Sequence, residues 1–452
     1  MISLILSDLR RLTREKLSMI AFLAGTLCAL LAAINGAHWI DRLETTRAGF
    51  LDLNARSEAE YRARFAGPQW TDVDSADAPY TTRRAFAYPI PLLADFTVGR
   101  SHLEPTMAQV RMGYRSDTLF KNYQIDNPER LQRGVFDLSF VVVVVAPLLL
   151  IGLGYGLFSE DRDSGAARLI LVQSGGIDRL LAARSFNRLA LVATPLLIAT
   201  IILLAMGPEW AGRPGAAALW LISAWIGLLF WWAIILLINL TRFSAETAAL
   251  ALLAIWVVLV FVAPPLVDAI ARSVHPPPSR MDQIIASRSA ELDATKKYAN
   301  DHPSDGLPEV QRVKDVIAEY HRISLAHERS IRPMSERFDE RLAHQQEFSE
   351  RLQLLSPPMA LAATLADISG TGVNSYVPLR RAAKEYLGNY QKALSRGIAD
   401  NRLFTLADHD ALPSFEAPPR AVPTHLGVLW TATVTTFFFA AAIFRLRTIE
   451  VG

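Results

Sequence analysis

The hydrophobic residues of this chain gather in long apolar stretches that alternate with polar segments. Six of the stretches hold about 20 mostly apolar residues, the length that an α-helix needs to cross the hydrocarbon core of a bilayer. These stretches are 17–40, 136–158, 189–206, 216–240, 248–270 and 426–444. Because a helix satisfies its backbone hydrogen bonds internally, we expect all six to be spanning helices of an all-α membrane protein.

Basic residues are unevenly distributed between the loops that join the predicted spans. The lead 1–16, the loop 159–188 and the C-terminal tail carry clustered arginines, whereas the loop between the third and fourth spans carries only Arg213. Loops rich in arginine and lysine stay on the cytoplasmic side of a membrane. The pattern therefore predicts that both termini and the 159–188 loop are cytoplasmic.

The lead 1–16 has the pattern of an amphipathic helix. Its apolar residues share one helical face, and its charged residues lie elsewhere. The apolar residues are Ile2, Ile5, Leu6, Leu9 and Leu12. This arrangement favours a helix that lies in the membrane interface. A signal peptide has a shorter apolar stretch than 17–40, so we expect the lead to be retained.

Two long segments, 41–135 and 271–425, then fall on the external side. The first starts with a helical pattern and continues into proline- and tyrosine-rich turns, for which the sequence predicts no fold. The second has apolar residues at heptad spacing over 310–355, which predicts a long helix that Pro333 should kink or break. A shorter helix from Met281 onward should pack against it. We expect a mainly helical domain with a hairpin standing off the membrane; the alternative is a compact bundle lying on it.

The sequence contains no recognisable catalytic or cofactor-binding motif. It lacks the GxxxxGK[ST] loop that cradles nucleotide phosphates and the HExxH pair that binds zinc. The triplet Asp408-His409-Asp410 could bind a metal, but its polar surroundings favour a solvated turn. The 46 basic and 44 acidic residues nearly balance, so net charge gives no reason to expect binding to nucleic acid. A single cysteine excludes a zinc–cysteine cluster. We therefore expect no enzymatic activity, no metal and no cofactor.

Ionisable residues are nearly absent from the interiors of the predicted spans. Asp137 and Asp268 lie at outer boundaries, where we expect water to reach them. An ion or proton relay needs ionisable groups at mid-depth. The pattern argues against an ion-coupled carrier, so energy for transport would have to come from elsewhere.

The loop 159–188 mixes acidic and basic residues. Acids and an arginine directly follow the second span, a glycine then precedes an amphipathic stretch, and another arginine begins the helix that leads into the third span. These residues are Glu160, Asp161, Arg162, Asp163, Gly165, Arg168 and Arg179. The pattern predicts a short charged helix across the cytoplasmic face, suited to docking on a soluble partner. An ordinary positively charged loop is the alternative.

Together these features resemble the permeases of ABC-2 type transporters, which have an amphipathic lead, six spans and a coupling helix between spans two and three. The family's serine-glutamate-arginine pattern after span two corresponds to 159–165, although Ala166 and Ala167 replace the usual threonine and leucine. The chain is also similar to a bacterial subset with two large external segments, from which it departs at His102 and Ser369. The matching motifs are 98–105 (Val-Gly-Arg-Ser-His-Leu-Glu-Pro), 127–128 (Asn-Pro), 134–138 (Gly-Val-Phe-Asp-Leu), 356–358 (Ser-Pro-Pro) and 369–371 (Ser-Gly-Thr).

The resemblance implies a permease subunit of an ATP-driven exporter in a bacterial inner membrane. ATP hydrolysis would be carried by a separate ATPase subunit, and a second permease, identical or related, would complete the membrane part. The large external segments would guide substrate onward or hold a periplasmic partner. The uncharged spans, surrounded by membrane lipid, favour a hydrophobic or amphipathic substrate.

The resemblance also assigns roles to particular segments. The region from Glu160 to Arg179 would contact the ATPase, and the loop that ends at Glu246 would form a second, smaller contact. Spans two and five would line the pathway at the dimer interface, and Pro264-Pro265 would mark the end of span five. In a rival interpretation the same machinery drives an external helical stalk without moving a substrate.

Overall fold

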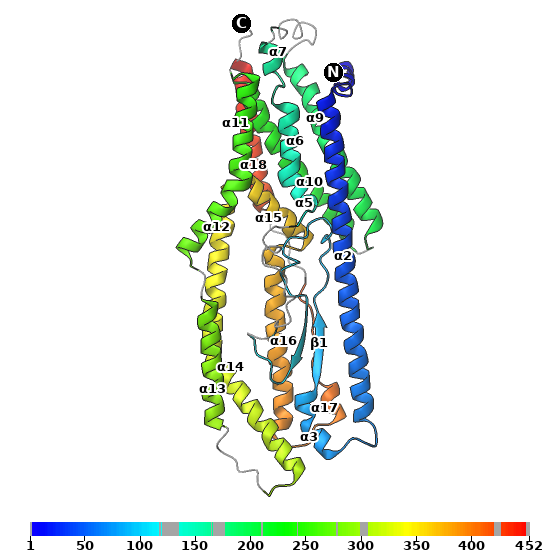
Figure 1. Cartoon of the computed structure of the whole chain (residues 1–452), viewed down its shortest axis with the longest axis vertical. Helices are drawn as coiled ribbons and strands as arrows, with labels where there is room; N and C mark the ends of the chain where they lie inside the picture. The colour runs from blue at the N-terminus through cyan, green and yellow to red at the C-terminus, as the bar shows by residue number, and fades with distance from the viewer. Residues whose placement is uncertain are drawn as a thin grey trace.

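The chain is elongated, and most of its helices run along the long axis (Figure 1). The computed structural model describes residues 2–116, 119, 135–163, 165, 177–208, 211–241, 243–276, 279–298, 306–419 and 426–448. The most apolar helices gather at one end of the long axis, which also holds both termini and is called here the apolar end. The opposite, polar end contains charged and aromatic residues on helices and a small sheet.

Five helices in the described part of the chain are long and apolar enough to cross a membrane. They are α2 (Lys16–Phe65), α9 (Ile177–Met206), α10 (Arg213–Asn239), the continuous helix of α11 (Ala245–Val257), η2 (Val258–Val262) and α12 (Ala263–Val274), and α18 (Leu426–Thr448). The chain is thus mostly helical with five candidate spans, and five of the six predicted spans coincide with them.

The remaining predicted span, 136–158, is shorter in the structure. It consists of α5 (Leu138–Phe140), the π-helical η1 (Val141–Val145) and α6 (Ala146–Gly154), and a turn follows. The helix starts where Asp137 caps it: the carboxylate accepts hydrogen bonds from the backbone N–H groups of Phe140 (2.8 Å) and Val98 (2.9 Å). Asp137 is buried, so the expectation that water reaches it is wrong.

The prolines Pro264 and Pro265 do not interrupt the helix of the fifth predicted span. They lie in the first turn of α12, directly after the π-helical η2, and the helix continues to Val274. Proline lacks a backbone N–H, and the wider π turn before the pair accommodates the rings without a break. The helix therefore runs through the predicted boundary without interruption.

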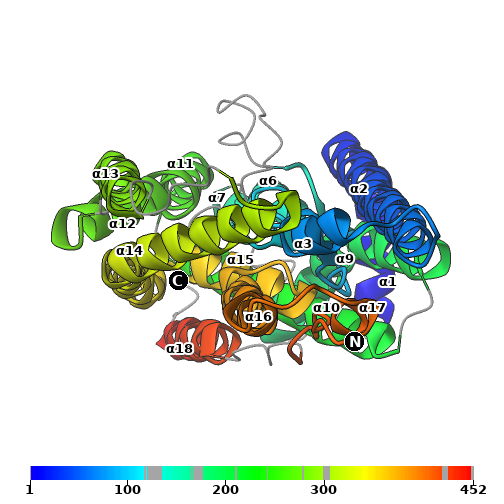
Figure 2. The same cartoon turned by 90° about the horizontal axis from the view of Figure 1, so that it is seen from below.

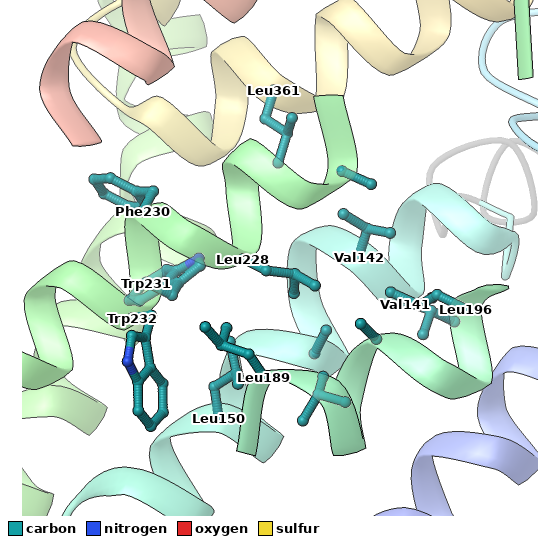
Figure 3. Close-up of a cluster of buried hydrophobic side chains, with 14 of the residues drawn as sticks. Val141, Val142, Leu150, Leu189, Leu196, Leu228, Phe230, Trp231, Trp232 and Leu361 are labelled. Atoms are coloured by element: carbon teal, nitrogen blue, oxygen red, sulfur yellow. The ribbon is translucent and has the colours of Figure 1, made fainter. Parts of the chain in front are cut away.

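Large aromatic side chains of α10 fill the core of the apolar end. Trp220, Trp231 and Trp232 are almost fully buried, and Figure 3 shows the last two beside Leu150 and Leu228. Side chains of this size bury the most surface per residue, and between membrane helices it is such close packing that favours association. The helix α10 is therefore the central helix of this end.

The helix α15 (Pro357–Ser369) packs against α10 and α18. Its Leu361 belongs to the apolar core and lies so close to Gly227 that a Cβ atom at that glycine would clash with it (Figure 3). Pro357 and Pro358 occupy the first turn, where a missing N–H is tolerated. The segment 271–425 therefore contributes α15 to the apolar core.

The polar end is built from both long segments. The helix α2 extends unbroken to Phe65 and is followed by α3 (Asp72–Thr81) and by an antiparallel hairpin of β1 (Arg83–Ala87) and β2 (Met107–Arg111). The strands pack on α16 (Val373–Ala399) through a cluster that contains Phe86, Tyr88, Tyr386 and Tyr390. The small sheet corrects the all-α prediction for this end.

The helices α13 (Arg280–Tyr298) and α14 (Glu309–Gln353) form the predicted hairpin (Figure 1). The α14 helix runs through Pro333 without a break, and Figures 1 and 2 show it as two stretches that meet at an angle. A proline inside a helix removes one hydrogen bond and crowds the preceding turn, which bends the helix. The expectation of a kink agrees with this shape, whereas a break does not occur.

Candidate functional site

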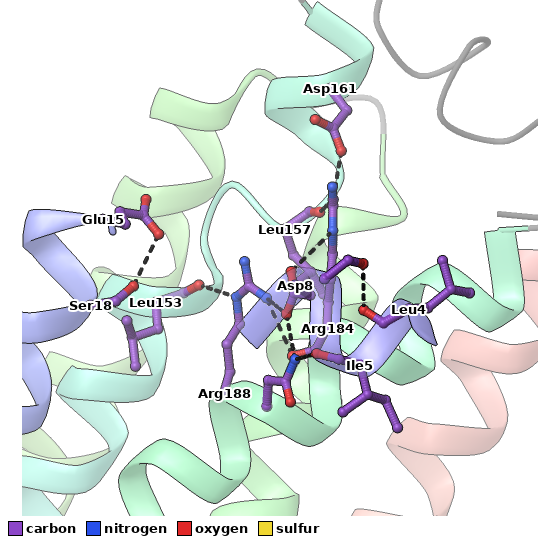
Figure 4. A network of polar contacts seen from close by, with 12 residues as sticks. Leu4, Ile5, Asp8, Glu15, Ser18, Leu153, Leu157, Asp161, Arg184 and Arg188 are labelled. Atoms are coloured by element: carbon purple, nitrogen blue, oxygen red, sulfur yellow. Dashed lines mark hydrogen bonds and ion pairs between the residues drawn. The ribbon is translucent and has the colours of Figure 1, made fainter. Parts of the chain in front are cut away.

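Four charged side chains meet at the apolar end, between α1 (Ile2–Leu12), α7 (Ser159–Asp163) and the first turns of α9 (Figure 4). The Arg184 guanidinium lies 2.5 Å from the Asp161 carboxylate and 3.9 Å from that of Asp8. Arg188 reaches Asp8 at 3.4 Å. All four side chains are buried, and together with Asn187 they are called here the inner network.

The inner network also holds the backbone of three segments. Arg184 donates to the carbonyl of Leu157 (2.5 Å), and Arg188 donates to the carbonyl of Leu153 (2.8 Å). Asn187 donates both to the carbonyl of Ile5 and to Asp8, each at 2.9 Å. Hydrogen bonds to charged groups are stronger than neutral ones. The lead helix, the end of the second apolar helix and α9 are therefore joined as one unit.

A neighbouring set of contacts adds the loop 241–246 to this unit. Arg162 donates to the carbonyl of Thr241 (2.7 Å) and to that of Phe243. The buried Asn239 donates to the carbonyl of Gly154 (2.8 Å) and accepts from the N–H of Phe158 (3.3 Å). The two segments that the sequence marks as contacts for a partner are thus adjacent in space.

Besides Arg162, the predicted contact residues fall into three groups. Arg179 on α9 and Glu246 on α11 are exposed, and Gly165 forms an exposed turn with φ of +72°. Asp161 faces inward and pairs with Arg184, so its carboxylate is not available to a partner. The side chains of Glu160 and Asp163, residue Arg168, and the predicted amphipathic helix around it lie outside what the structure describes.

Sequence reasoning missed Asp8, Asn187 and Arg188. The periodicity of the lead predicts Asp8 away from its apolar face, yet Asp8 is buried against α9. A signal was present, because Arg184 and Arg188 are four residues apart and therefore lie on one face of a helix. Two buried arginines on one face require a carboxylate, and Asp8 supplies it.

A cavity of about 790 Å³ lies where the apolar helices meet the polar end. Its walls come from η2 and α12, the C-terminal part of α14, and α15. The hydroxyl of Ser356, the residue before α15, donates to the carbonyl of the lining residue Leu259 at 3.0 Å and so ties α15 to η2. The volume lies within the range of roughly 300–1,000 Å³ that is usual for small-molecule sites.

The motifs 98–105 and 369–371 are distant in sequence, and both form part of the cavity wall. In the first motif, Arg100 donates its N–H to the carbonyl of Thr371 (2.9 Å), and the Thr371 hydroxyl donates to the carbonyl of Thr97 (2.9 Å). Gly99 has φ of +50°, and a Cβ atom there would come within 2.6 Å of Thr371. The motifs 98–105 and 369–371 are thus structurally one unit, whereas 127–128 lies outside the described residues.

The triplet Asp408-His409-Asp410 is not a solvated turn. His409 is buried, stacks on Tyr61 with ring centroids 5.4 Å apart, and places Nε2 3.1 Å from a carboxylate oxygen of Glu58. The described residues contain no cluster of three or more groups able to hold a metal ion. The triplet instead ties α17 (Leu406–Asp410) to α2.

Acid will weaken the contact between Glu58 on α2 and His409 on α17. Burial raises the pKa of Glu58, but the contacts of its carboxylate with His409 and Arg84 outweigh burial and hold the pKa below its usual value. A depressed carboxyl pKa contributes stability that is present above the unfolded pKa of about 4.3 and is lost as the pH falls through the folded pKa. We expect wild type to lose more thermal stability than Glu58→Gln between pH 6 and about pH 3.5. Glu60→Gln, an exposed control on the same helix, should titrate like wild type; equal acid sensitivity of all three proteins would contradict the prediction.

One part of the chain matches a known family. No curated protein and no solved structure matches the chain. Residues 285–417 match the family described as a domain of unknown function, DUF3526. This range covers most of α13, all of α14, α15 and α16, and α17, and thus one wall of the cavity and the partners of the β hairpin. The chain is therefore a multi-pass membrane protein candidate that carries a DUF3526 domain.

Proposed function

We propose that this chain is the permease subunit of an ATP-driven exporter of the ABC-2 type, working with a separate ATPase in a bacterial inner membrane. The inner network is the observation that carries the proposal. A partner that moves one end of a membrane protein can drive its helices only if the contact surface is rigidly joined to them. Buried, paired arginines and backbone hydrogen bonds supply that rigidity.

The exposed residues beside the inner network supply the proposed contact surface. Arg179 lies in the first turn of α9 and Glu246 in the first turn of α11, and both are exposed at the apolar end. The unit that contains Arg162 and the loop 241–246 would pass movement to α10 and α11. A second permease would complete the membrane part, and the cavity would take a hydrophobic or amphipathic substrate.

A second candidate function is force transmission without transport. The observation that favours it is the single helix α2, which starts beside the inner network and reaches the polar end, where Arg62 pairs with Asp410 at 2.7 Å. The two functions differ in their need for the cavity. Filling the cavity with a large side chain would abolish export, whereas a force transmitter would keep its ATP-driven movement.

Co-purification tests the proposal. The tagged chain, expressed with its native gene neighbours and extracted in mild detergent, should bring an ATPase in equal amount. Exchanging the charges with Arg179→Glu and Glu246→Lys should reduce the bound ATPase about tenfold, a change of about 1.4 kcal/mol. The exposed Arg322→Glu on α14 should have no effect. A well-folded wild-type chain that brings no ATPase would refute the proposal.

A further inference from the structure

We propose that the 790 Å³ cavity binds an acyl-chain amphiphile with a zwitterionic head group, taken up from the surrounding membrane. Binding in the cavity is argued from its lining alone. Transport of this amphiphile, in addition to its binding, rests on the function proposed above.

One part of the cavity wall is apolar and belongs to the membrane helices. The side chains come from η1, η2, α12 and α15. They are Val143, Leu259, Val260, Pro264, Met359, Ala360, Ala362 and Ala363. An acyl chain that moves from the bilayer onto this surface stays in apolar surroundings and leaves no polar group unpaired.

The apolar wall is continuous with a face that lipid can reach. Neighbouring residues of η2 and α12 point outward, and about half of each side chain is exposed. These residues are Val258, Phe261, Val262 and Leu266. The same short helical stretch therefore presents one face to the cavity and another to the outside of the protein. An acyl chain that enters from the side would stay in contact with apolar side chains throughout.

The other part of the wall is charged, and its charges nearly balance. It carries three arginines and four acids. They are Arg100, Arg351, Arg380, Asp268, Glu347, Glu350 and Asp367. Most of these charges already have partners within the protein, so the wall is close to neutral. Arg100 and Arg380 share Glu104, at 3.4 and 3.2 Å. Arg351 pairs with Glu347 at 2.6 Å, and Asp268 pairs with Arg272 at 2.9 Å. An anionic head group would meet a wall with more carboxylates than guanidinium groups, whereas a zwitterionic head finds partners for both of its charges.

A photoactivatable lipid tests the site. The probe is lysophosphatidylcholine with a diazirine in its acyl chain, added to the purified full-length chain in detergent. We expect labelled peptides from η2 and α15. Ala363→Trp or Ala362→Phe, each filling the cavity from α15, should reduce this labelling about tenfold, or by about 1.4 kcal/mol. Ala343→Trp, at an exposed position of α14 outside the lining, should leave it unchanged.

The head group is tested with the matching lysophosphatidylglycerol probe, which carries a net negative charge. We expect it to label η2 and α15 several-fold less than the zwitterionic probe. Equal labelling by both probes would overturn the head-group assignment. Labelling that survives both cavity-filling variants, or that falls only on outward faces such as that of α2, would overturn the site itself. Neither result affects co-purification of an ATPase, so this inference and the proposed function can fail separately.

Discussion

Replacing Arg213 with methionine will destabilise the chain by about 3–5 kcal/mol, the usual cost of leaving one partner of a buried ion pair alone. The Arg213 side chain is 2% exposed and that of its partner Asp95 is 1% exposed. Arg213 also donates to the carbonyls of Leu92 (2.7 Å) and Leu203 (3.1 Å), which link the start of α10 to α9 and to the segment before the motif 98–105. The loss should appear as a lower midpoint of thermal unfolding in detergent.

Two further variants separate the loss of the buried ion pair from the general effect of removing an arginine. The double variant Arg213→Met with Asp95→Leu removes both charges and should recover part of the lost stability. Arg272→Met breaks the exposed pair with Asp268, whose side chains are 63% and 59% exposed, and should cost less than about 1 kcal/mol. If Arg213→Met costs no more than Arg272→Met, the buried pair does not form in the folded protein.

The second large effect is expected at Asp8 in the inner network. Asp8→Leu leaves Arg184 and Arg188 buried near each other with one carboxylate fewer, which should cost about 3 kcal/mol. The lead helix should also detach from α9, because the Asp8 interactions with Arg188 and Asn187 are lost. Limited proteolysis of the lead and the midpoint of thermal unfolding measure the two consequences.

An exposed acidic residue on α9, the helix that carries Arg184 and Arg188, serves as the control. Asp178 lies exposed in the first turn of α9, where its charge favours the helix dipole by only about 0.5 kcal/mol. Asp178→Leu should therefore leave the lead protected from protease. The double variant Asp8→Leu with Arg188→Leu should be more stable than Asp8→Leu alone. Equal behaviour of Asp8→Leu and Asp178→Leu would show that the inner network contributes little.

Local pattern predicted the elements that depend on short-range sequence. Runs of apolar residues marked the helices that could cross a membrane, and heptad spacing marked α14 and its partner α13. The amphipathic lead was recognisable from the 3.6-residue period of its leucines and isoleucines. These features follow from neighbouring residues along one helix, so they need no knowledge of the tertiary fold.

Long-range pairs could not be predicted in this way. Arg213 was interpreted only as the sparse charge of an external loop, whereas its partner Asp95 lies 118 positions earlier. His409 was assigned to a solvated turn because its neighbours in sequence are polar, yet it is covered by Tyr61 of α2. The insertion of α15 into the apolar core depends on Gly227 leaving room for Leu361. Each of these contacts joins segments whose proximity only the fold determines.

The interleaving of the two long segments at the polar end has a consequence for how the protein is made. The β hairpin comes from the first segment and its packing partners from the second, as in the hydrogen bond from Tyr390 to the carbonyl of Thr82, 308 positions earlier. At a synthesis rate of roughly 5–20 residues per second, the hairpin waits roughly 15–60 seconds for those partners. Its aromatic residues and unpaired strand edges are open to aggregation and proteolysis during that interval. Newly made chains should therefore depend on a holding chaperone far more than mature ones.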